Sequence, residues 1–225
     1  MIIDELITDR TQADVTRLLE LRAIGYADMT AAEKAEYAAS KGAYNYTDLN
    51  RVGNAMTYVK NLLDQIAADV ADTYDDAVNV IVAYLHYDAT YYDTSVLPND
   101  LGVVLYVTPV DIEAVKTDWT QSMIAAKVTD AIHNAFSVLY IPNNLNKLRS
   151  CIPLTGAPST PSMDNLTYRK ANDIEKILQI IYDTAVQYRE DKLNAIYAAE
   201  ADAILRYTNT ELNWIWSDEA FAGEF

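Results

Sequence analysis

Cysteine is almost absent from this chain of 225 residues, since Cys151 is the only one. A single cysteine excludes an intramolecular disulfide framework and a metal site built from several cysteine ligands. Histidine is nearly as scarce, and neither His86 nor His133 lies beside a cysteine or a suitably spaced cluster of carboxylates. We therefore expect no metal ion and no cofactor, and we interpret both histidines as structural residues.

Glycine and proline are also scarce, with six of each. A β-sandwich or barrel needs many turn residues, whereas the abundant alanine, leucine and isoleucine of this chain favour helices. The sequence therefore predicts a mainly α fold. One exception is the run Leu101–Val107, which is rich in β-branched residues and lies between Pro98 and Pro109, so a short β hairpin is predicted around residues 96–108.

Basic residues are few. The chain contains 17 Lys and Arg and 33 Asp and Glu, so its formal net charge is −16. Such a surface repels the phosphate backbone, so we expect no nucleic acid as a partner. The simplest interpretation of the charge is a solvated acidic surface. An acidic mimic of DNA that blocks a nucleic-acid enzyme is the alternative.

Long apolar runs are missing as well. The chain has no stretch of roughly 18 consecutive apolar residues, and Met1–Leu6 does not begin a basic region followed by an apolar one. We therefore expect a soluble protein that is not exported by the usual route and has no membrane partner.

Signatures of catalysis are equally absent. The sequence has no glycine-rich phosphate cradle and no Gly-x-Ser-x-Gly elbow, and the carboxylates of Asp69, Asp72, Asp75 and Asp76 do not follow the spacing of a calcium loop. We therefore expect that the protein is not an enzyme. A glycoside hydrolase stays open as a weaker alternative, because a catalytic pair of carboxylates has no sequence signature.

The feature that is present is an internal repeat. Thr8–Gln12 returns as Thr117–Gln121, and a Tyr-x-x-x-Asn motif occurs at Tyr46 with Asn50 and again at Tyr168 with Asn172. Aligning the two asparagines superposes six positions of one helix on six of the other: Leu49, Val52, Met56, Val59, Leu63 and Ile66 on Ala171, Ile174, Leu178, Ile181, Ala185 and Tyr188.

This repeat predicts two similar helical units. Residues 1–110 form the first unit, with a tyrosine-rich insertion, and residues 111–225 form the second, with a proline-rich strap and an aromatic tail. Each unit is expected to contain about three helices, of which the last is long and heptad-patterned.

In the first unit, two short helices should precede the long one. Thr11 caps a helix that ends near Gly25, and Thr30 caps a second helix that ends at Gly42 in the left-handed conformation. Asn45 caps the long helix. Its apolar seam continues through Val70 and should pack against the matching seam of the second unit, although exchange with a neighbouring copy would satisfy the same pattern.

In the second unit, an apolar helix follows the repeated motif and includes Ile124 and Phe136. The asparagine-rich run Asn143–Asn146 indicates a turn or a helix start. Pro153–Pro161 is too rich in proline to be helical and should form an extended strap. The last long helix should run from Tyr168, capped by Thr167, toward Tyr207.

Aromatic residues supply the candidate contacts with partner proteins. Tyrosine offers a large apolar face and a hydroxyl group, a combination that is common at interfaces. Two groups stand out, a tyrosine-dense loop after the first long helix and the acidic C-terminal tail: Tyr84, Tyr87, Tyr91 and Tyr92, and Trp214, Trp216, Phe221 and Phe225. For the tyrosines, ordinary packing of half-buried rings is the simpler interpretation, and a contact surface for a partner protein or a glycan is the alternative.

Several segments carry a resemblance to a known family. Thr8–Val15, Met29–Lys34 and Gly42–Val52 resemble the opening of a family of structural proteins from phages and prophages of gut Firmicutes. Lys116–Thr120 and Leu166–Leu178 resemble the second half of that family, and the Ala222–Glu224 ending is similar too.

The resemblance implies a virion structural protein that is made in the host cytoplasm and acts by protein–protein interaction. Its expected place is the tail, as a baseplate or fibre-associated component, and its expected partners are other virion proteins and further copies of itself. A head-decorating or head-to-tail connecting protein is the nearest alternative. A host-modulating acidic binder belongs to a different class. Residues 72–111 and the tail before Ala222 depart from the family pattern.

Overall fold

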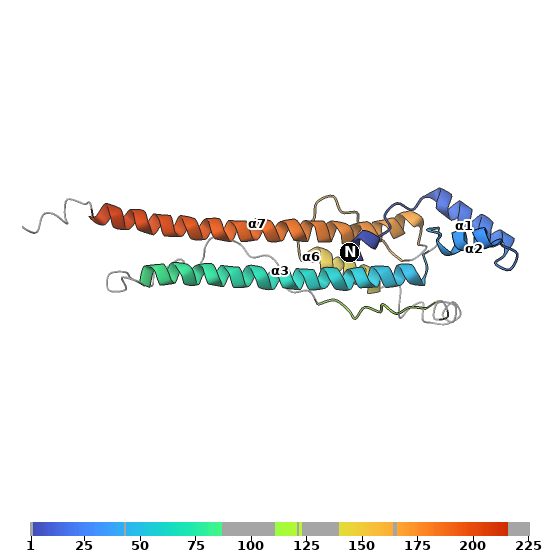
Figure 1. The fold of residues 1–225 in the computed structure, drawn as a ribbon, viewed down its shortest axis with the longest axis horizontal. Helices are drawn as coiled ribbons and strands as arrows, with labels where there is room; N and C mark the ends of the chain where they lie inside the picture. Colours follow the sequence, from blue (N-terminus) through green and yellow to red (C-terminus); the bar gives the residue numbers. More distant parts are fainter. Residues whose placement is uncertain are drawn as a thin grey trace, which may run out of the picture. The chain divides into compact units, whose positions relative to one another are not determined.

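The computed structural model describes residues 2–42, 44–86, 111–120, 122, 140–163 and 166–215, with only the backbone of 82–86, 140 and 207–215. This part of the chain is mainly helical and contains no strand, which confirms the predicted fold class (Figure 1). The hairpin predicted around residues 96–108 lies outside the described residues. No helix in the described ranges is both long and apolar enough to cross a membrane.

The described helices comprise one short 3-10 helix and five α-helices. They are η1 (Ile2–Glu5), α1 (Gln12–Ile24), α2 (Ala31–Ala38), α3 (Tyr46–His86), α6 (Tyr140–Ser150) and α7 (Tyr168–Ile215).

The two short helices α1 and α2 begin at the predicted capping residues. Thr11 and Asp14 form a reciprocal capping box on α1, and Thr30 and Glu33 form another on α2. Gly25 ends α1 with a φ of +83°, a backbone conformation that favours glycine. These boundaries confirm the prediction.

Gly42 corrects the prediction made for it. Helix α2 already ends at Ala38, and Gly42 does not have a positive φ. A Cβ atom at this position would lie 2.3 Å from the carbonyl oxygen of Asp14 and 2.8 Å from the Cβ of Leu18. Glycine is required here because the chain passes very close to α1, and not because it ends a helix.

The long helices also begin at the predicted caps. The Asn45 side chain accepts a hydrogen bond from the Thr47 amide at 2.7 Å, and Thr167 Oγ1 accepts one from the Lys170 amide at 3.3 Å. Both helices continue further than predicted. Helix α7 extends past Tyr207 to Ile215, and α3 reaches His86, so Tyr84 belongs to a helix and not to a loop.

The asparagine-rich run and the proline-rich segment lie next to each other. Asn143–Asn146 lies inside α6, and residues 153–161 contain no helix, as predicted for the strap. The strap is tied to α6 by a hydrogen bond from the Arg149 guanidinium to the Pro158 carbonyl and by another, of 2.6 Å, from Thr160 Oγ1 to Asn146 Oδ1.

The chain divides into two compact units. Unit 1 contains Met1–Asp64 and Val107–Ala185, and unit 2 contains Gln65–Tyr106 and Val186–Phe225. Helices α3 and α7 contribute their first parts to unit 1 and their second parts to unit 2. The predicted division between residues 110 and 111 separates two repeats that are similar in sequence. The compact units are defined by contacts, so they do not test that division, and it stays a prediction.

The core of unit 1 is formed by the repeated apolar seam. Eight seam residues from the first parts of α3 and α7 are fully buried: Val52, Met56, Val59, Leu63, Ile174, Leu178, Ile181 and Ala185. Leu145 and Leu148 of α6 are buried in the same unit. Leu49, at the start of the seam, is only half-buried. The rings of Tyr58 and Tyr182 lie 6.0 Å apart, so the two seams face each other within one chain.

In unit 2, the second parts of α3 and α7 also contribute buried residues and an ion pair. Ile66, Val70, Ala77 and Ile81 of α3 are buried, as is Ile196 of α7, and Arg189 forms an ion pair with Asp69 at 2.8 Å.

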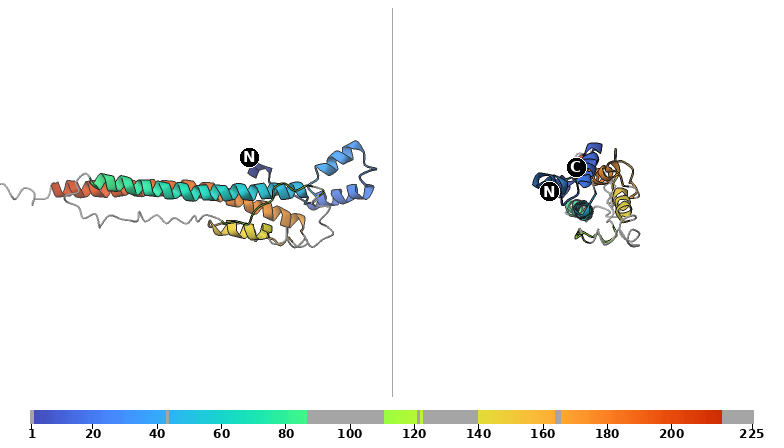
Figure 2. Two further views of the ribbon diagram at one scale, coloured as in Figure 1. Left: turned by 90° about the horizontal axis from the view of Figure 1, so that it is seen from below. Right: turned by 90° about the vertical axis from the view of Figure 1, so that its right-hand side faces the viewer.

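The contacts between α3 and α7 fix their direction and register. Within unit 1, the residue numbers of Arg51 and Glu175 differ by 124, as do those of Tyr58 and Tyr182. This is close to the difference of 122 between Asn50 and Asn172. Contacts at a constant difference require parallel helices, so within unit 1 the first parts of α3 and α7 run in the same direction (Figures 1 and 2). The pairing therefore follows the alignment of the sequence repeat.

Candidate functional site

The first repeated motif is held by the asparagine of the second repeat. Asn172, in the first turns of α7, accepts a hydrogen bond from the Arg10 amide at 3.1 Å through Oδ1. Its Nδ2 donates a hydrogen bond to the Arg10 carbonyl oxygen at 2.9 Å. One side chain thus pairs with both backbone groups of a residue that belongs to no helix.

The second repeated motif is held in the same way by the asparagine of the first repeat. Asn50 Oδ1 accepts from the Trp119 amide at 2.7 Å, and Asn50 Nδ2 donates to the Trp119 carbonyl oxygen at 2.9 Å. Each Tyr-x-x-x-Asn motif therefore binds the Thr-Asp-x-Thr-Gln motif of the other half. We call these two contacts the crossed asparagine clamps.

The clamps allow the third residue of the motif to differ between the repeats. Asparagine carries both an acceptor and two donors, so it can pair with the amide and the carbonyl of one residue at once. Since both hydrogen bonds go to the backbone, they can form whichever side chain the clamped residue carries. The Arg10 guanidinium also lies 3.5 Å from Asn172 Oδ1. Arg10 and Trp119 can therefore occupy equivalent positions, and each has a separate environment.

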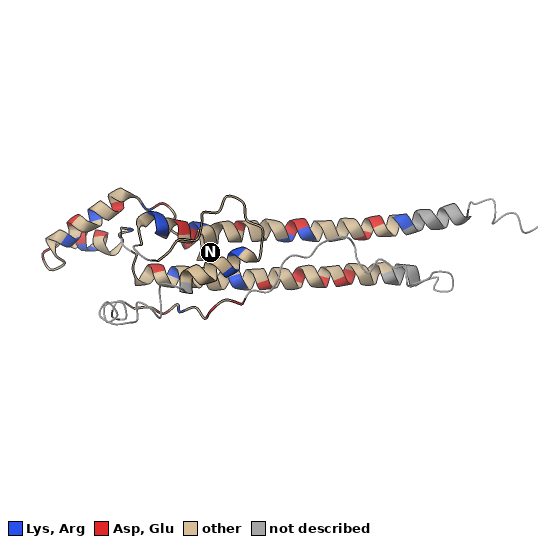
Figure 3. Ribbon diagram, turned by 180° about the vertical axis from the view of Figure 1, so that it is seen from behind, with Lys and Arg blue, Asp and Glu red and all other residues tan. Residues whose placement is uncertain are grey.

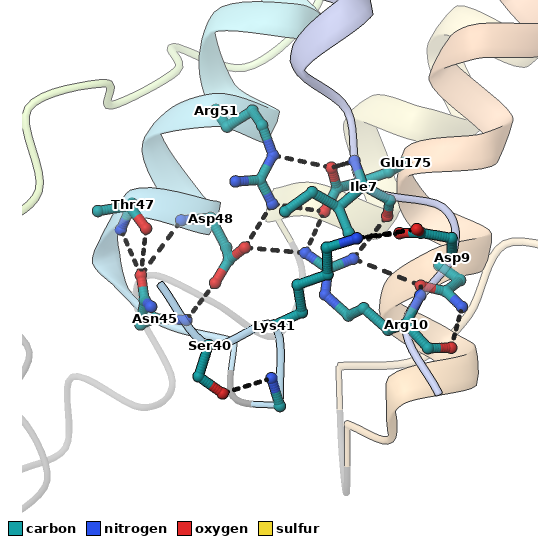
Figure 4. A network of polar contacts seen from close by, with 12 residues as sticks. Ile7, Asp9, Arg10, Ser40, Lys41, Asn45, Thr47, Asp48, Arg51 and Glu175 are labelled. Carbon is teal, nitrogen blue, oxygen red and sulfur yellow. Dashed lines mark hydrogen bonds and ion pairs between the residues drawn. The ribbon is translucent and has the colours of Figure 1, made fainter. Parts of the chain in front are cut away.

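Arg10 lies in a buried charged cluster, which we define as Arg10, Asp48, Arg51 and Glu175 (Figure 4). Their side chains are 2%, 6%, 12% and 0% exposed, so Arg10, Asp48 and Glu175 are buried and Arg51 lies at the edge of the cluster. Two guanidinium groups and two carboxylates make its formal charge zero. A balanced cluster of this kind avoids the large cost of an unpaired buried charge.

The Glu175 carboxylate joins three segments of the chain. Its Oε1 accepts from Arg10 at 2.6 Å and from Arg51 at 2.9 Å. Its Oε2 accepts from Arg51 Nε at 2.9 Å and from the backbone amide of Ile7 at 2.6 Å. The N-terminal segment, α3 and α7 therefore meet at one side chain.

Asp48 serves the cluster and the helix cap together. Its Oδ1 accepts from Arg10 at 2.8 Å and also from Arg51. Its Oδ2 accepts from the Asn45 amide at 2.7 Å, which completes the N-terminal cap of α3. All four carboxylate oxygens of the cluster thus accept hydrogen bonds within the chain, an arrangement suited to holding segments together.

The carboxylates of the cluster shift the pKa of Arg51. Burial lowers the pKa of its guanidinium, but hydrogen bonds and the negative charges of Glu175 and Asp48 outweigh that effect and raise the pKa above its usual value. Arg51 therefore stays charged in the folded protein.

Tyr44 closes one side of the cluster. The Arg10 guanidinium lies 5.5 Å from the centre of the Tyr44 ring, a cation–π geometry. Burial raises the pKa of the Tyr44 hydroxyl well above its usual value, and the charges of Glu175 and Asp48 add to this. The hydroxyl group and Arg10 Nε are the buried side-chain polar atoms that lack a hydrogen-bond partner in the described structure.

Among the described residues, only the Asn172 clamp has such a cluster beside it, and the Asn50 clamp has no equivalent. By the alignment of the asparagines, Glu175 corresponds to Gly53, and a Cβ at Gly53 would lie 2.9 Å from the Lys116 carbonyl oxygen. At one clamp the helix thus offers a carboxylate to the neighbouring segment, and at the other it admits the segment's backbone. Beside the second clamp, the ammonium of Lys116 lies 5.7 Å from the Trp119 ring.

The structure does not describe the side chains of the predicted partner contacts. The backbones of Tyr84 and Trp214 lie in α3 and α7, and their side chains are outside the description. Tyr87, Tyr91, Tyr92, Trp216, Phe221 and Phe225 are outside the described residues, as is His133. These contacts therefore stay predictions.

The acidic stretch of α3 behaves as a solvated face. Asp72, Asp75 and Asp76 are exposed, and Asp69 pairs with Arg189. Among the residues that the structure describes, no group of three or more His, Cys, Asp or Glu side chains could hold a metal ion.

The charged cluster itself was missed by sequence reasoning. Arg10, Asp48 and Arg51 lie inside the repeated or family-like motifs, and Glu175 lies beside the buried seam residue Ile174. The sequence signal that could have indicated the cluster is Glu175 itself, a carboxylate three residues after Asn172 and next to a position of the apolar seam.

Comparisons of the chain with protein-family models, with curated proteins and with solved structures found no match.

Proposed function

We propose that the protein is a structural component of a bacteriophage virion that acts by protein–protein interaction and not by catalysis. The observation that carries this proposal is the use made of the family-like motifs. Arg10, Asp48, Asn50, Arg51 and Asn172 all lie in segments that resemble phage structural proteins, and all of them bind other parts of the same chain. The motifs build a scaffold.

Within the particle, the proposed place is the tail, as a baseplate or fibre-associated component. Parallel helices held in register by the repeat suit such a part, because they present long side-chain surfaces to neighbouring subunits. The proposed partners are other virion proteins and further copies of this chain. The net charge of −16 supports partners other than nucleic acid.

Purified particles of the phage or prophage that encodes the chain provide the test. Quantitative mass spectrometry should find the protein at a fixed ratio to the major tail protein in every preparation. Gold-labelled antibodies against the chain should mark the tail tip in electron micrographs. Labelling of the head or of the neck would move the proposal to a head-decorating or connecting protein.

The contradicting result is equally clear. A protein that is absent from washed particles and stays in the lysate, bound to one DNA-processing host enzyme, would overturn the virion assignment. That outcome would support the acidic mimic of DNA.

A further inference from the structure

The crossed asparagine clamps do not by themselves distinguish their two segments. Each clamp pairs with one amide and one carbonyl oxygen, at 2.7–3.1 Å, and every residue except proline offers both groups. The clamped residue is Arg10 at Asn172 and Trp119 at Asn50, and in both segments Thr-Asp precedes it and Thr-Gln follows it. We call this observed arrangement the crossed pairing and the opposite arrangement the direct pairing.

The two clamps lie close to each other in unit 1. Arg51, the residue after Asn50, forms an ion pair with Glu175 at 2.9 Å, and Glu175 lies three residues after Asn172. Each segment therefore lies near the clamp that it does not occupy. Selection of the crossed pairing requires a difference between the surroundings of the two clamps.

The surroundings differ in charge. Basic and acidic residues lie together around the start of α7 (Figure 3). Three charged residues beside the Asn172 clamp have equivalents, by the alignment of the asparagines, that differ from them in charge: Asp48, Arg51 and Glu175 correspond to Lys170, Asp173 and Gly53. The first three carry a formal charge of −1, whereas the second three carry none. Only the Asn172 clamp therefore needs a cation from the segment that it holds.

The direct pairing would leave charges unbalanced. With Trp119 at the Asn172 clamp, the carboxylates of Glu175 and Asp48 would share the single guanidinium of Arg51, although the Glu175 side chain is 0% exposed. Arg10 at the Asn50 clamp would lose both of its carboxylates. An unpaired charge in a buried cluster disfavours such a state by about a hundredfold or more.

We propose that Glu175 and Asp48 are specificity-determining residues, which direct Arg10 to the Asn172 clamp and keep Trp119 out of it. The asparagines supply hydrogen bonds to either segment, and the carboxylates supply the difference between the two pairings. This selection lies within one chain and does not depend on the virion assignment.

A second arginine tests the selection in the full chain. In Trp119→Arg, either pairing places one arginine beside Glu175 and the other at the Asn50 clamp, so the two pairings no longer differ in charge. We expect NMR spectra with two sets of resonances for the clamped amides. Nuclear Overhauser effects to the side-chain amides of Asn50 and Asn172 identify the clamp that holds each segment. The wild-type chain should show the crossed set alone.

Trp119→Leu is the matched control. It also removes the indole ring but leaves a neutral side chain, so the crossed pairing should remain the only one. Two pairings in this control would overturn the proposal, because the ring of Trp119 would then make the selection. The crossed pairing alone in Trp119→Arg would overturn it as well, since the chain connections would then be sufficient.

A double variant provides an independent test if Trp119→Arg does not fold. Arg10→Leu combined with Glu175→Gln removes the selecting ion pair and leaves Asp48 balanced by Arg51. We expect both pairings, and the crossed pairing alone would contradict the selection. Leu63→Ala opens a cavity in the core of unit 1, so it should weaken the fold without producing a second pairing.

Discussion

At the scale of single residues, Glu175 shows how a buried charge can be made compatible with a folded core. Its carboxylate receives hydrogen bonds from two arginines and from the Ile7 amide, and its side chain is fully buried. The cluster is tolerated in the core because each of its charged groups has a partner of opposite charge. Removing one member leaves its partners buried and unpaired.

Glu175→Gln should therefore destabilise the protein strongly. The substitution keeps the shape of the side chain but leaves two buried guanidinium groups with the single carboxylate of Asp48. We expect a loss of about 3–5 kcal/mol in the free energy of unfolding, measured by urea denaturation. The control is Glu36→Gln, which breaks the exposed pair with Arg17 and should leave the midpoint nearly unchanged. Equal effects of the two variants would contradict the assignment of the cluster.

The capping box of α1 predicts a dependence on pH. The hydrogen bonds from the Thr11 hydroxyl and the Thr11 amide lower the pKa of Asp14 below its usual value of 3.8. A carboxyl group whose pKa is lower in the folded than in the unfolded state stabilises the protein at pH values above its unfolded-state pKa. This stabilisation is lost as the pH falls through the folded-state pKa. Asp14→Asn should thus lower the melting temperature at pH 7, and the difference should vanish well below pH 3.8. A difference that is constant with pH would refute the capping role.

At the scale of elements, most helix boundaries were predictable because they depend on local chemistry. Thr11, Thr30, Asn45 and Thr167 cap the helices at which the sequence placed them, and Gly25 ends α1. Gly42 was misinterpreted because its requirement comes from the close approach of α1, which is a tertiary contact.

The candidate site was less predictable for the same reason. The sequence shows that Asn50 and Asn172 are equivalent, but not that each binds the motif of the opposite half. The cluster joins residues 10 and 175, which are 165 positions apart, and no local pattern specifies that encounter. The apolar register was visible, whereas the partners of polar groups near it were not.

The seam of α3 gives a prediction at this scale. Val59 is fully buried, so Val59→Asp places an unpaired charge in the core of unit 1. We expect a loss of more than about 4 kcal/mol, or failure to fold. Asn61→Asp adds the same charge at an exposed position of the same helix and should change little. Unchanged thermal stability of Val59→Asp would remove the seam from the core.

At the scale of the whole molecule, the charge sets the conditions for assembly. Copies with a net charge of −16 repel one another, and salt screens that repulsion. Light scattering should show a discrete oligomer whose population rises with protein and salt concentration. A chain that stays monomeric under all these conditions would contradict the proposed self-association.

The crossed asparagine clamps bind the two repeats to each other. The rate of hydrogen exchange at the clamped amides measures these hydrogen bonds directly. Arg10 and Trp119 lie outside the helices, yet their amides donate to Asn172 and Asn50. Both amides should exchange slowly in NMR experiments, and Asn172→Leu should speed the exchange of Arg10 more than that of Trp119. Exchange of both amides at the rates of unprotected loops would show that the repeats do not hold each other in this way.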